Sequence, residues 1–304
     1  PARLTRLTVR NRTTRRLRLQ GAAFVELVLG NDRSRSAPMI RAHFDAENAA
    51  VVARNPFSAD FSDRSIALSC DRPVDACTAS RTGFLGRHGS MSRPAALDRW
   101  PAQRSGPELA TDGDPGAGIR WTLNLAPGES AETTIILAEG TAETLPGTLD
   151  ATRAAGAADR GLGAMRDGWD RILGSLQVKT PDPKLDLMVN AWLPYQALGC
   201  RIRSRTGFYQ ASGAFGFRDQ LQDTAAMLLQ DPSLCRRQLL NAASRQFPEG
   251  DVQHWWLPRS GAGVRTMISD DVVWLGNVTA QYVAATGDTG LLDEPVEFIA
   301  GPPL

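Results

Sequence analysis

The chain has 304 residues, a formal net charge of +1, 22% charged residues and 42% hydrophobic residues. These proportions are ordinary for a soluble globular protein, and the length suggests about two domains. The near-neutral charge excludes a strong global field directed at nucleic acid or a membrane surface, and no apolar run is long enough to span a bilayer.

The cysteine pattern argues against a metal centre and against a disulfide framework. None of the four cysteines has CxxC spacing or an accompanying histidine, and the chain shows no signal peptide. We therefore expect reduced thiols in a cytoplasmic segment that binds no metal and no nucleic acid and makes no direct membrane contact. The cysteines are Cys70, Cys77, Cys200 and Cys235.

Residues 1–145 are predicted to form β structure. Short β-rich runs at 4–9 and 17–29 flank a polar turn, and 119–125 alternates apolar with polar residues, as a half-buried strand does. A Pro-Gly turn then leads to a returning strand at 133–137, so we expect a hairpin there.

Long irregular stretches separate these strands. Residues 53–64 and 81–118 are rich in Gly, Pro, Ser and Asp. Loops of such length usually carry contacts or belong to a larger sheet. The β part is therefore predicted to be an antiparallel sandwich, in which His43 and His88 are surface or packing residues.

Residues 146–179 are predicted to be a linker that contains a helix around Trp169. The chain is then predicted to be helical to its end. Asp182 can cap the first of these helices, with Pro183 at the first helical position, and Pro194 should kink or end that helix.

The helices of residues 180–304 are joined by long loops rich in aromatic and acidic residues. Further helices are expected at 219–230, 233–246 and 270–286, the last closed by Gly287 as a C-cap. Successive helices with such loops suggest an α/α toroid whose loops form a site on one face. The alternative is a plain helical bundle.

The stretch 205–223 is the strongest candidate for a binding site. Its glycines let backbone approach a ligand closely, and its aromatic residues, Tyr209 among them, offer flat faces on which sugar rings stack. Asp219, at a helix N-terminus, is held ionised by the helix dipole, and with Arg218 it can clamp vicinal hydroxyls. The alternative is a buried loop in which Arg218 and Asp219 form a structural salt bridge.

The loop 248–258 is a second candidate. It contains consecutive tryptophans, Trp255 and Trp256, which cannot easily both point into one core. An exposed Trp255 beside His254 would make a sugar platform. The alternative is that both rings pack in an interface and that His254 is a structural histidine.

The start of the last helix is a third candidate. Ser269 or Asp270 would cap the helix, which leaves Asp271 as an adjacent carboxylate. Because two neighbouring carboxylates repel each other, Asp271 needs a partner. A polyol or Arg265 would supply one.

Several longer motifs match a known family. The helical part carries Trp192-Leu193-Pro194-Tyr195-Gln196, Gly207-Phe208-Tyr209-Gln210, Phe217-Arg218-Asp219-Gln220-Leu221-Gln222-Asp223, Glu249-Gly250-Asp251-Val252-Gln253-His254-Trp255-Trp256 and Ile268-Ser269-Asp270-Asp271. The β part carries Arg54-Asn55-Pro56-Phe57 and Thr82-Gly83-Phe84-Leu85-Gly86-Arg87-His88-Gly89. Over nearly its whole length the chain resembles glycoside hydrolase family 94, the inverting β-glucoside phosphorylases formerly placed in glycosyltransferase family 36. The β-part motifs resemble the form found within cyclic β-1,2-glucan synthases.

The resemblance implies a β-sandwich, a helical linker and an (α/α)6 barrel. We therefore expect a partial antiparallel sandwich at 1–145, a linker with a helix at 146–179, and an incomplete barrel at 180–304. The substrate-binding residues that we select are Arg205, Tyr209, Arg218, Asp219, Gln222, His254, Trp255, Asp270 and Asp271.

The resemblance also implies inverting phosphorolysis of β-glucans, β-1,2-linked in this subgroup. A carboxylic acid protonates the glycosidic oxygen, and phosphate attacks the anomeric carbon from the opposite face and releases α-glucose 1-phosphate. No cofactor is expected, and inorganic phosphate is the co-substrate. The family's general acid, an Asp in a Trp-Asn-Asp-Gly type motif, is expected after Leu304, so we expect no activity from this chain alone.

Two other functions remain open, a non-catalytic glucan-binding module and an inverting hydrolase on the same toroid. The chain begins at Pro1 without a methionine, and both ends look cut. We therefore expect a piece of a longer protein, with the remainder of the same polypeptide as a partner beside glucan and phosphate. The whole protein would lie in the bacterial inner membrane through segments outside this chain.

Overall fold

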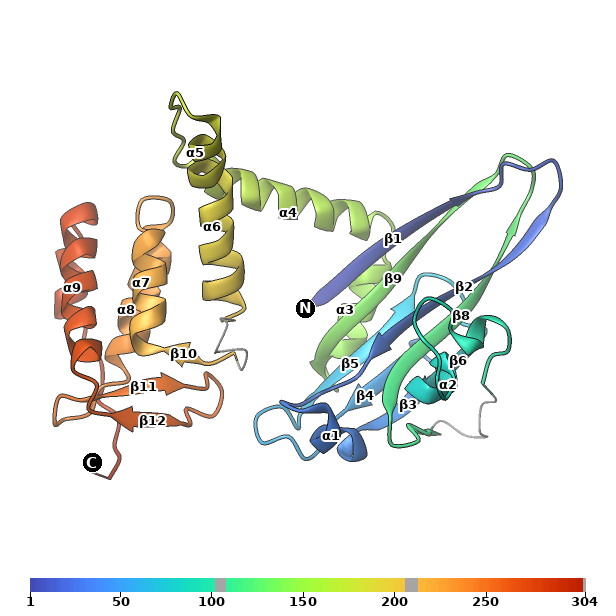
Figure 1. Cartoon of the computed structure of the whole chain (residues 1–304), viewed down its shortest axis with the longest axis horizontal. Helices are drawn as coiled ribbons and strands as arrows, with labels where there is room; N and C mark the ends of the chain where they lie inside the picture. The colour runs from blue at the N-terminus through green and yellow to red at the C-terminus, as the bar shows by residue number, and fades with distance from the viewer. Residues whose placement is uncertain (102–107, 206–212, 303–304) are drawn as a thin grey trace. The chain divides into compact units, whose positions relative to one another are not determined.

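The structure, a computed structural model, describes residues 1–101, 108–205 and 213–302. The chain forms two compact units, Pro1–Gly163 and Ala164–Leu304 (Figure 1). The first unit consists mainly of antiparallel sheets and the second mainly of helices. The predicted order of a β part followed by a helical part is confirmed.

Two antiparallel sheets form the first unit within the described residues. The larger has the strand order β1-β9-β5-β4-β3-β7, and the smaller has the order β2-β8-β6. Both contribute to one hydrophobic core, as the predicted sandwich requires. The elements are β1 (Ala2–Arg10), β2 (Leu17–Glu26), α1 (Arg33–Ser36), β3 (Arg41–Asp45), β4 (Ala50–Arg54), β5 (Arg64–Cys70), β6 (Ala76–Ser80), α2 (Arg81–Leu85), β7 (Glu108–Leu109), β8 (Pro115–Leu125), β9 (Ser130–Thr141) and α3 (Leu145–Arg153).

The core between the two sheets is built from inward-facing side chains. Val51 and Leu68 of the larger sheet and Trp121 of the smaller are almost completely buried. Burying each aliphatic side chain stabilises the fold by about 1.5–3 kcal/mol. Trp121 lies directly over Gly21 of the paired strand β2, where an added Cβ would come within 2.4 Å of the indole ring. Glycine at position 21 therefore makes room for the largest side chain of this core.

The predicted hairpin of residues 119–137 is wrong. Strand β8 pairs with β2 and β6, whereas β9 pairs with β1 and β5, so the turn between them carries the chain from one sheet to the other. Asn11, in the neighbouring β1–β2 connection, fastens this crossing: its buried amide donates to Leu125 O and Ala126 O at 3.1 and 3.0 Å. Alternating polarity identified both strands but not their partners, because the pattern is the same for either sheet.

Several strands lie in stretches of the predicted β part for which we predicted no individual strand. Strands β4, β5 and β6 are largely buried and rich in Ala, Ser and Cys, so they lack the alternation of apolar and polar residues that marks a half-buried strand. The stretch 81–118, expected to be irregular, contains α2, β7 and the start of β8. His43 and His88 are exposed, as predicted for surface residues.

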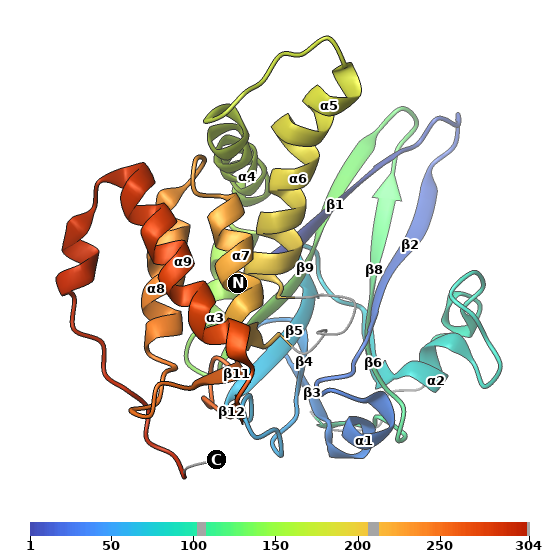
Figure 2. The same cartoon turned by 60° about the vertical axis from the view of Figure 1, so that its left-hand side comes forward.

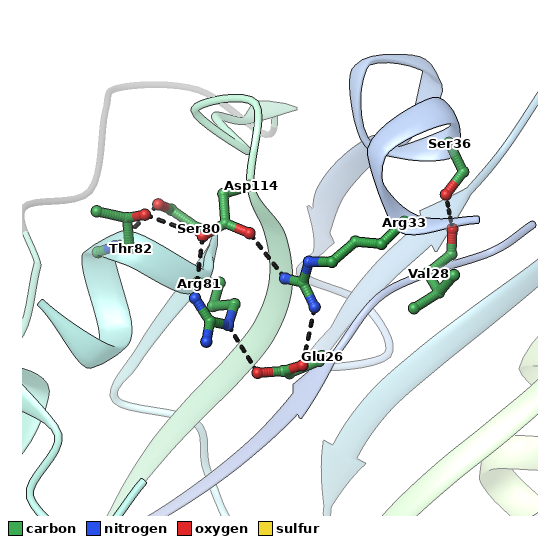
Figure 3. Close-up of polar contacts among 9 residues, drawn as sticks. Glu26, Val28, Arg33, Ser36, Ser80, Arg81, Thr82 and Asp114 are labelled. Atoms are coloured by element: carbon green, nitrogen blue, oxygen red, sulfur yellow. Dashed lines mark hydrogen bonds and ion pairs between the residues drawn. The ribbon is translucent and has the colours of Figure 1, made fainter. Parts of the chain in front are cut away.

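A charged network ties the short helices of the first unit to the smaller sheet (Figure 3). Asp114, just before β8, accepts from Arg33 of α1 at 2.7 Å and from Thr82 of α2 at 3.0 Å. Glu26, at the end of β2, accepts from Arg33 at 2.8 Å and from Arg81 at 2.6 Å, and the hydrogen bond from Arg81 lowers the pKa of the Glu26 carboxyl. Because these charges are paired with one another, the network has a structural role.

The second unit contains helices and a small antiparallel sheet of order β10-β11-β12. Helix α4 begins in the first unit. No helix among the described residues has both the length and the hydropathy needed to cross a membrane. The elements are α4 (Ala157–Gly174), α5 (Pro183–Leu187), α6 (Leu193–Tyr195), β10 (Phe215–Gly216), α7 (Phe217–Ala226), α8 (Pro232–Ala243), β11 (Val252–Trp256), β12 (Gly263–Thr266) and α9 (Ser269–Thr286).

The helix that begins at Pro183 runs through α5 and α6 and continues to Arg203. Asp182 caps it as predicted, since its carboxylate accepts from the N–H of Lys184 at 2.9 Å. The helix does not end at Pro194. It forms wide π-type turns instead, which accommodate the missing N–H of the proline within the helix.

Helices α7, α8 and α9 pack against one another around a second core (Figure 2). Phe217, Leu239, Trp256 and Val278 are almost completely buried there and come from α7, α8, β11 and α9. Helix α9 ends at Gly287, whose φ of 72° is left-handed and whose N–H donates to Val283 O, so the predicted C-cap is confirmed.

Candidate functional site

The N-terminal end of α7 is built around Gly216. Its backbone is extended (φ −97°, ψ 137°), and its N–H donates to the side-chain carbonyl of Gln220, which is buried one turn along the helix. The Asp219 carboxylate folds back over Gly216, where an added Cβ would lie 2.7 Å from Oδ2. A glycine thus leaves room for a carboxylate in the first helical turn, where the helix dipole favours negative charge.

Arg201, which we did not select from the sequence, is the cationic neighbour of Asp219. Its Nη2 lies 3.9 Å from Asp219 Oδ1, and its Nε donates to Asp223 Oδ2 at 3.0 Å. Burial raises the pKa of Asp223 to about 6, although the charge of Arg201 lowers it in part. The i, i+4 spacing of Asp219 and Asp223 puts both on one helix face and could have selected Asp223. No comparable spacing marks Arg201, which comes from the preceding helix.

Arg218 points to another helix and does not pair with Asp219. Its Nη1 donates to Asp270 Oδ2 at 2.6 Å, its Nε donates to Gln222 Oε1 at 3.0 Å, and its guanidinium lies 5.4 Å from the centre of the Trp274 ring. The alternative of a structural Arg218–Asp219 salt bridge is therefore wrong. Arg218 and Asp270 instead join the N-terminal turns of α7 and α9.

The stretch predicted as the loop 248–258 contains the strand β11. Successive residues of a strand point to opposite faces, so Trp256 is fully buried in the core whereas Trp255 is only half-buried. Trp255 pairs with Gly216 of β10, next to the start of α7. The expectation that the two tryptophans do not share one core is confirmed, and the reason is strand alternation.

The first turn of α9 carries Asp270 and Asp271 without a side-chain cap. Residue Ile268 occupies the cap position, so the prediction that Ser269 or Asp270 caps the helix is wrong. Asp271 is fully buried, and its Oδ2 lies 2.8 Å from His254 Nδ1. Burial raises the pKa of the Asp271 carboxyl, the hydrogen bond with His254 lowers it in part, and the charges of Asp270 and Asp219 raise it.

Arg265 is not the partner of Asp271. Its guanidinium is paired with Asp251 and with Glu249, at 2.6 and 2.9 Å from Nη2. The hydrogen bond from Arg265 lowers the pKa of Asp251. The sequence indicated correctly that Asp271 needs a partner, but His254 supplies it.

Two selected residues lie at or within the part of the chain that is not described. Arg205 is the last described residue before the gap; it has a φ of 49°, its Nε donates to Gly213 O at 2.6 Å, and its guanidinium lies 4.8 Å from the centre of the Phe215 ring. Tyr209 falls outside the described residues.

The polar groups therefore gather where α7 and α9 begin, beside β11. A separate groove of 580 Å³ in the second unit has a lining of apolar and aromatic side chains. Such a lining lacks the polar groups that fix the orientation of a polyhydroxyl ligand. The lining residues are Trp169, Leu173, Leu187, Met188, Ala191, Trp192 and Tyr195.

The cluster at α7 and α9 offers both hydrogen-bond acceptors and hydrogen-bond donors. Asp219 and Asp270 offer carboxylate oxygens, Arg201 and Arg218 offer guanidinium donors, and His254 offers a ring nitrogen. The described residues contain no group of three or more His, Cys, Asp or Glu side chains placed to hold a metal ion.

Comparison with known proteins identifies the class of this fold. Residues 1–155 match the model of the glycosyl hydrolase 94 supersandwich domain, and residues 168–301 match the model of the glycosyl hydrolase 94 superfamily catalytic domain. The chain belongs to glycosyl hydrolase family 94, as the resemblance indicated.

Three similar proteins are named as a glucan synthase or as phosphorylases, and the chain spans only part of the length of each. The chain is 47% identical, over its whole length, to the cyclic β-(1,2)-glucan synthase NdvB of Rhizobium meliloti (strain 1021), of which it spans 11%. It is 28% identical over 98% of its length to solabiose phosphorylase of Paenibacillus borealis, of which it spans 38%. It is 25% identical over 77% of its length to N,N'-diacetylchitobiose phosphorylase of Vibrio furnissii, of which it spans 32%.

Proposed function

We propose that this chain is part of a β-glucan-active phosphorylase or glycosyltransferase domain and binds the glucosyl unit that is transferred. The observation that carries the proposal is the joining of the starts of α7 and α9. Arg218, next to Asp219, pairs with Asp270 at 2.6 Å, and Asp271, next to Asp270, pairs with His254 at 2.8 Å. Carboxylates accept hydrogen bonds from vicinal hydroxyls, and the half-buried Trp255 offers an aromatic face to the ring.

The proposed reaction is inverting phosphorolysis of a β-1,2-linked glucan within a cyclic β-1,2-glucan synthase. Phosphate is itself an anionic nucleophile, so the second carboxylate that activates water in an inverting hydrolase is not needed. The names of the relatives support this proposal, since two of them are phosphorylases and the third makes a cyclic β-(1,2)-glucan. The helices of the second unit would then be part of an (α/α)6 barrel, with the remainder of the polypeptide supplying the general acid and the membrane segments.

The test uses the full-length protein that contains this segment, incubated with β-1,2-glucan oligosaccharides with and without inorganic phosphate. We expect release of α-glucose 1-phosphate that requires phosphate and falls by about 100-fold in Asp219→Asn, because a lost contact to the reacting sugar costs orientation. Asp288→Asn is the matched control: Asp288 is a carboxylate of the same unit that binds Tyr282 and Arg236, away from the cluster.

Two outcomes would contradict the proposal. Sugar release that does not depend on phosphate would show an inverting hydrolase instead. Glucan binding with neither product, in the full-length protein, would show a binding module.

A further inference from the structure

His254 is held from one side by a buried carboxylate. It lies where the pairing of β11 with β12 shifts register, between Gln253 and Trp255, and such a bulge turns a side chain out of the strand's alternation. Its Nδ1 is 2.8 Å from Oδ2 of Asp271, whose side chain is 1% exposed, while the imidazole itself is 38% exposed. The ring is thus anchored at one nitrogen and open at the other.

The two ring nitrogens therefore have different surroundings. Nδ1 faces Asp271, and within the described ranges Nε2 has no hydrogen-bond partner. The charged groups around the pair are Asp219 from α7 and Asp270 from α9, and Asp270 is itself paired with Arg218 at 2.6 Å. Since a carboxylate can only accept, Nδ1 must donate, and a neutral imidazole then keeps a lone pair on Nε2.

The carboxylate of Asp271 is also incompletely satisfied. Its second oxygen, Oδ1, is buried and makes no hydrogen bond to any described residue. Asp271 therefore depends on His254 for the one described hydrogen bond of its side chain, and a buried carboxylate without it would be costly. This dependence holds the imidazole in one orientation.

We propose that Asp271 is a positioning residue that fixes His254 as the Nδ1–H tautomer, so that Nε2 accepts a hydrogen bond from a hydroxyl of the bound glucosyl unit. The hydrogen bond between Nε2 and the glucosyl unit rests on the proposed function. The tautomer of His254 rests only on its contact with Asp271. An Nε2 that accepts is suited to a hydroxyl and unsuited to the unprotonated oxygens of phosphate, which offer it no proton.

The first test needs no ligand. The chain has three histidines, His43, His88 and His254, so ring-¹⁵N-labelled histidine gives three resolvable sets of signals. The set that disappears in His254→Gln belongs to His254. On the neutral imidazole we expect a protonated Nδ1 and an unprotonated Nε2. A neutral ring that carries its proton at Nε2 overturns the proposal.

The second test asks whether Asp271 sets this state. Asp271→Asn keeps the shape of the side chain and removes the acceptor-only carboxylate, so we expect the His254 signals to move to the Nε2–H form or to a mixture. Asp288→Asn is the control and should leave them unchanged. Unchanged His254 signals in a folded Asp271→Asn variant overturn the positioning role.

The third test separates the tautomer from the sugar contact. Titration with β-1,2-glucobiose should shift the Nε2 signal of His254 saturably, and both Asp271→Asn and His254→Gln should weaken binding by about tenfold. The double variant should bind no more weakly than either single variant, because Asp271 acts through His254. Additive losses overturn the positioning role. An Nδ1–H ring with no saccharide response leaves the tautomer standing and overturns the sugar contact of His254, whereas phosphate-dependent sugar release by the full-length protein tests the proposed function separately.

Discussion

Arg201 and Asp223 form an ion pair, with 3.0 Å between Nε and Oδ2, although burial raises the pKa of the Asp223 carboxyl to about 6. The same guanidinium lies 3.9 Å from Asp219, one helical turn away. Arg201 therefore lies between two carboxylates: Asp219, the candidate glucosyl-binding group, and Asp223, which is partly desolvated. This arrangement places a cation beside the Asp219 carboxylate before any ligand arrives.

The raised pKa of Asp223 predicts a pH-dependent stability. Between the ordinary pKa of 3.8 and about 6, the folded chain keeps a proton that the unfolded chain has lost, so the free energy of unfolding falls as pH rises through this window. In Asp223→Asn this dependence is absent. From pH 4 to pH 7 we expect the free energy of unfolding of the wild type to fall by up to about 3 kcal/mol relative to that of the variant. Urea denaturation followed by circular dichroism measures this free energy at each pH.

Asp288 is the control with the opposite sign. The hydrogen bond from Tyr282 lowers the pKa of Asp288, so its contribution to stability is present at higher pH and is lost as pH falls. The wild type should therefore lose stability relative to Asp288→Asn on acidification. If the wild type also lost stability relative to Asp223→Asn on acidification, the assigned environment of Asp223 would be wrong.

Gly216→Ala should displace Asp219 without unfolding the chain. The added Cβ would come within 2.7 Å of the Asp219 carboxylate, yet a φ of −97° is open to alanine. We expect saccharide affinity, measured by calorimetric titration, to fall by about tenfold or more because the carboxylate loses its position.

The matched glycine is Gly276, inside α9, where an added Cβ would meet nothing within 4 Å. Gly276→Ala should leave binding unchanged and stabilise the helix by about 0.5–1 kcal/mol. Equal affinity of Gly216→Ala and Gly276→Ala for the saccharide would argue against a role of Asp219 in binding.

Asn11→Ala should destabilise the first unit. The buried Asn11 amide donates to carbonyls of the β1–β2 connection and of the end of β8 and the turn after it, Arg15 O at 2.8 Å, Leu125 O at 3.1 Å and Ala126 O at 3.0 Å. Removing it leaves buried acceptors unpaired, so we expect a loss of about 2–4 kcal/mol in the free energy of unfolding. Asn124→Ala, at an exposed position of β8, should change it by less than about 0.5 kcal/mol. Similar losses in both variants would refute this role for Asn11.

The sequence predicted helices and strands well where local chemistry decides them. The cap at Asp182 and the C-cap at Gly287 follow from backbone groups within one helical turn, and both were predicted. Strand pairing depends instead on residues far apart in the chain, and β8 and β9 look like a hairpin although they belong to different sheets.

The sequence predicted which residues belong to the candidate site better than it predicted which of them interact. Asp271 was expected to need a partner, but Arg265 was already neutralised by Asp251, and a bulge in β11 brings His254 to Asp271 instead. Arg201 was missed because its carboxylate partners come from another helix, at a separation that no sequence periodicity encodes. The pairings that the sequence could not give are those formed between different elements.

Binding of a glucosyl unit by the cluster around Asp219 is measured most directly by calorimetric titration of the chain with β-1,2-glucobiose. We expect saturable binding by the wild type and by Asp288→Asn, and at least about tenfold weaker binding by Asp219→Asn, because its amide cannot replace a charged acceptor. Equal affinity in Asp219→Asn and the wild type would contradict the assignment of this cluster as the saccharide site.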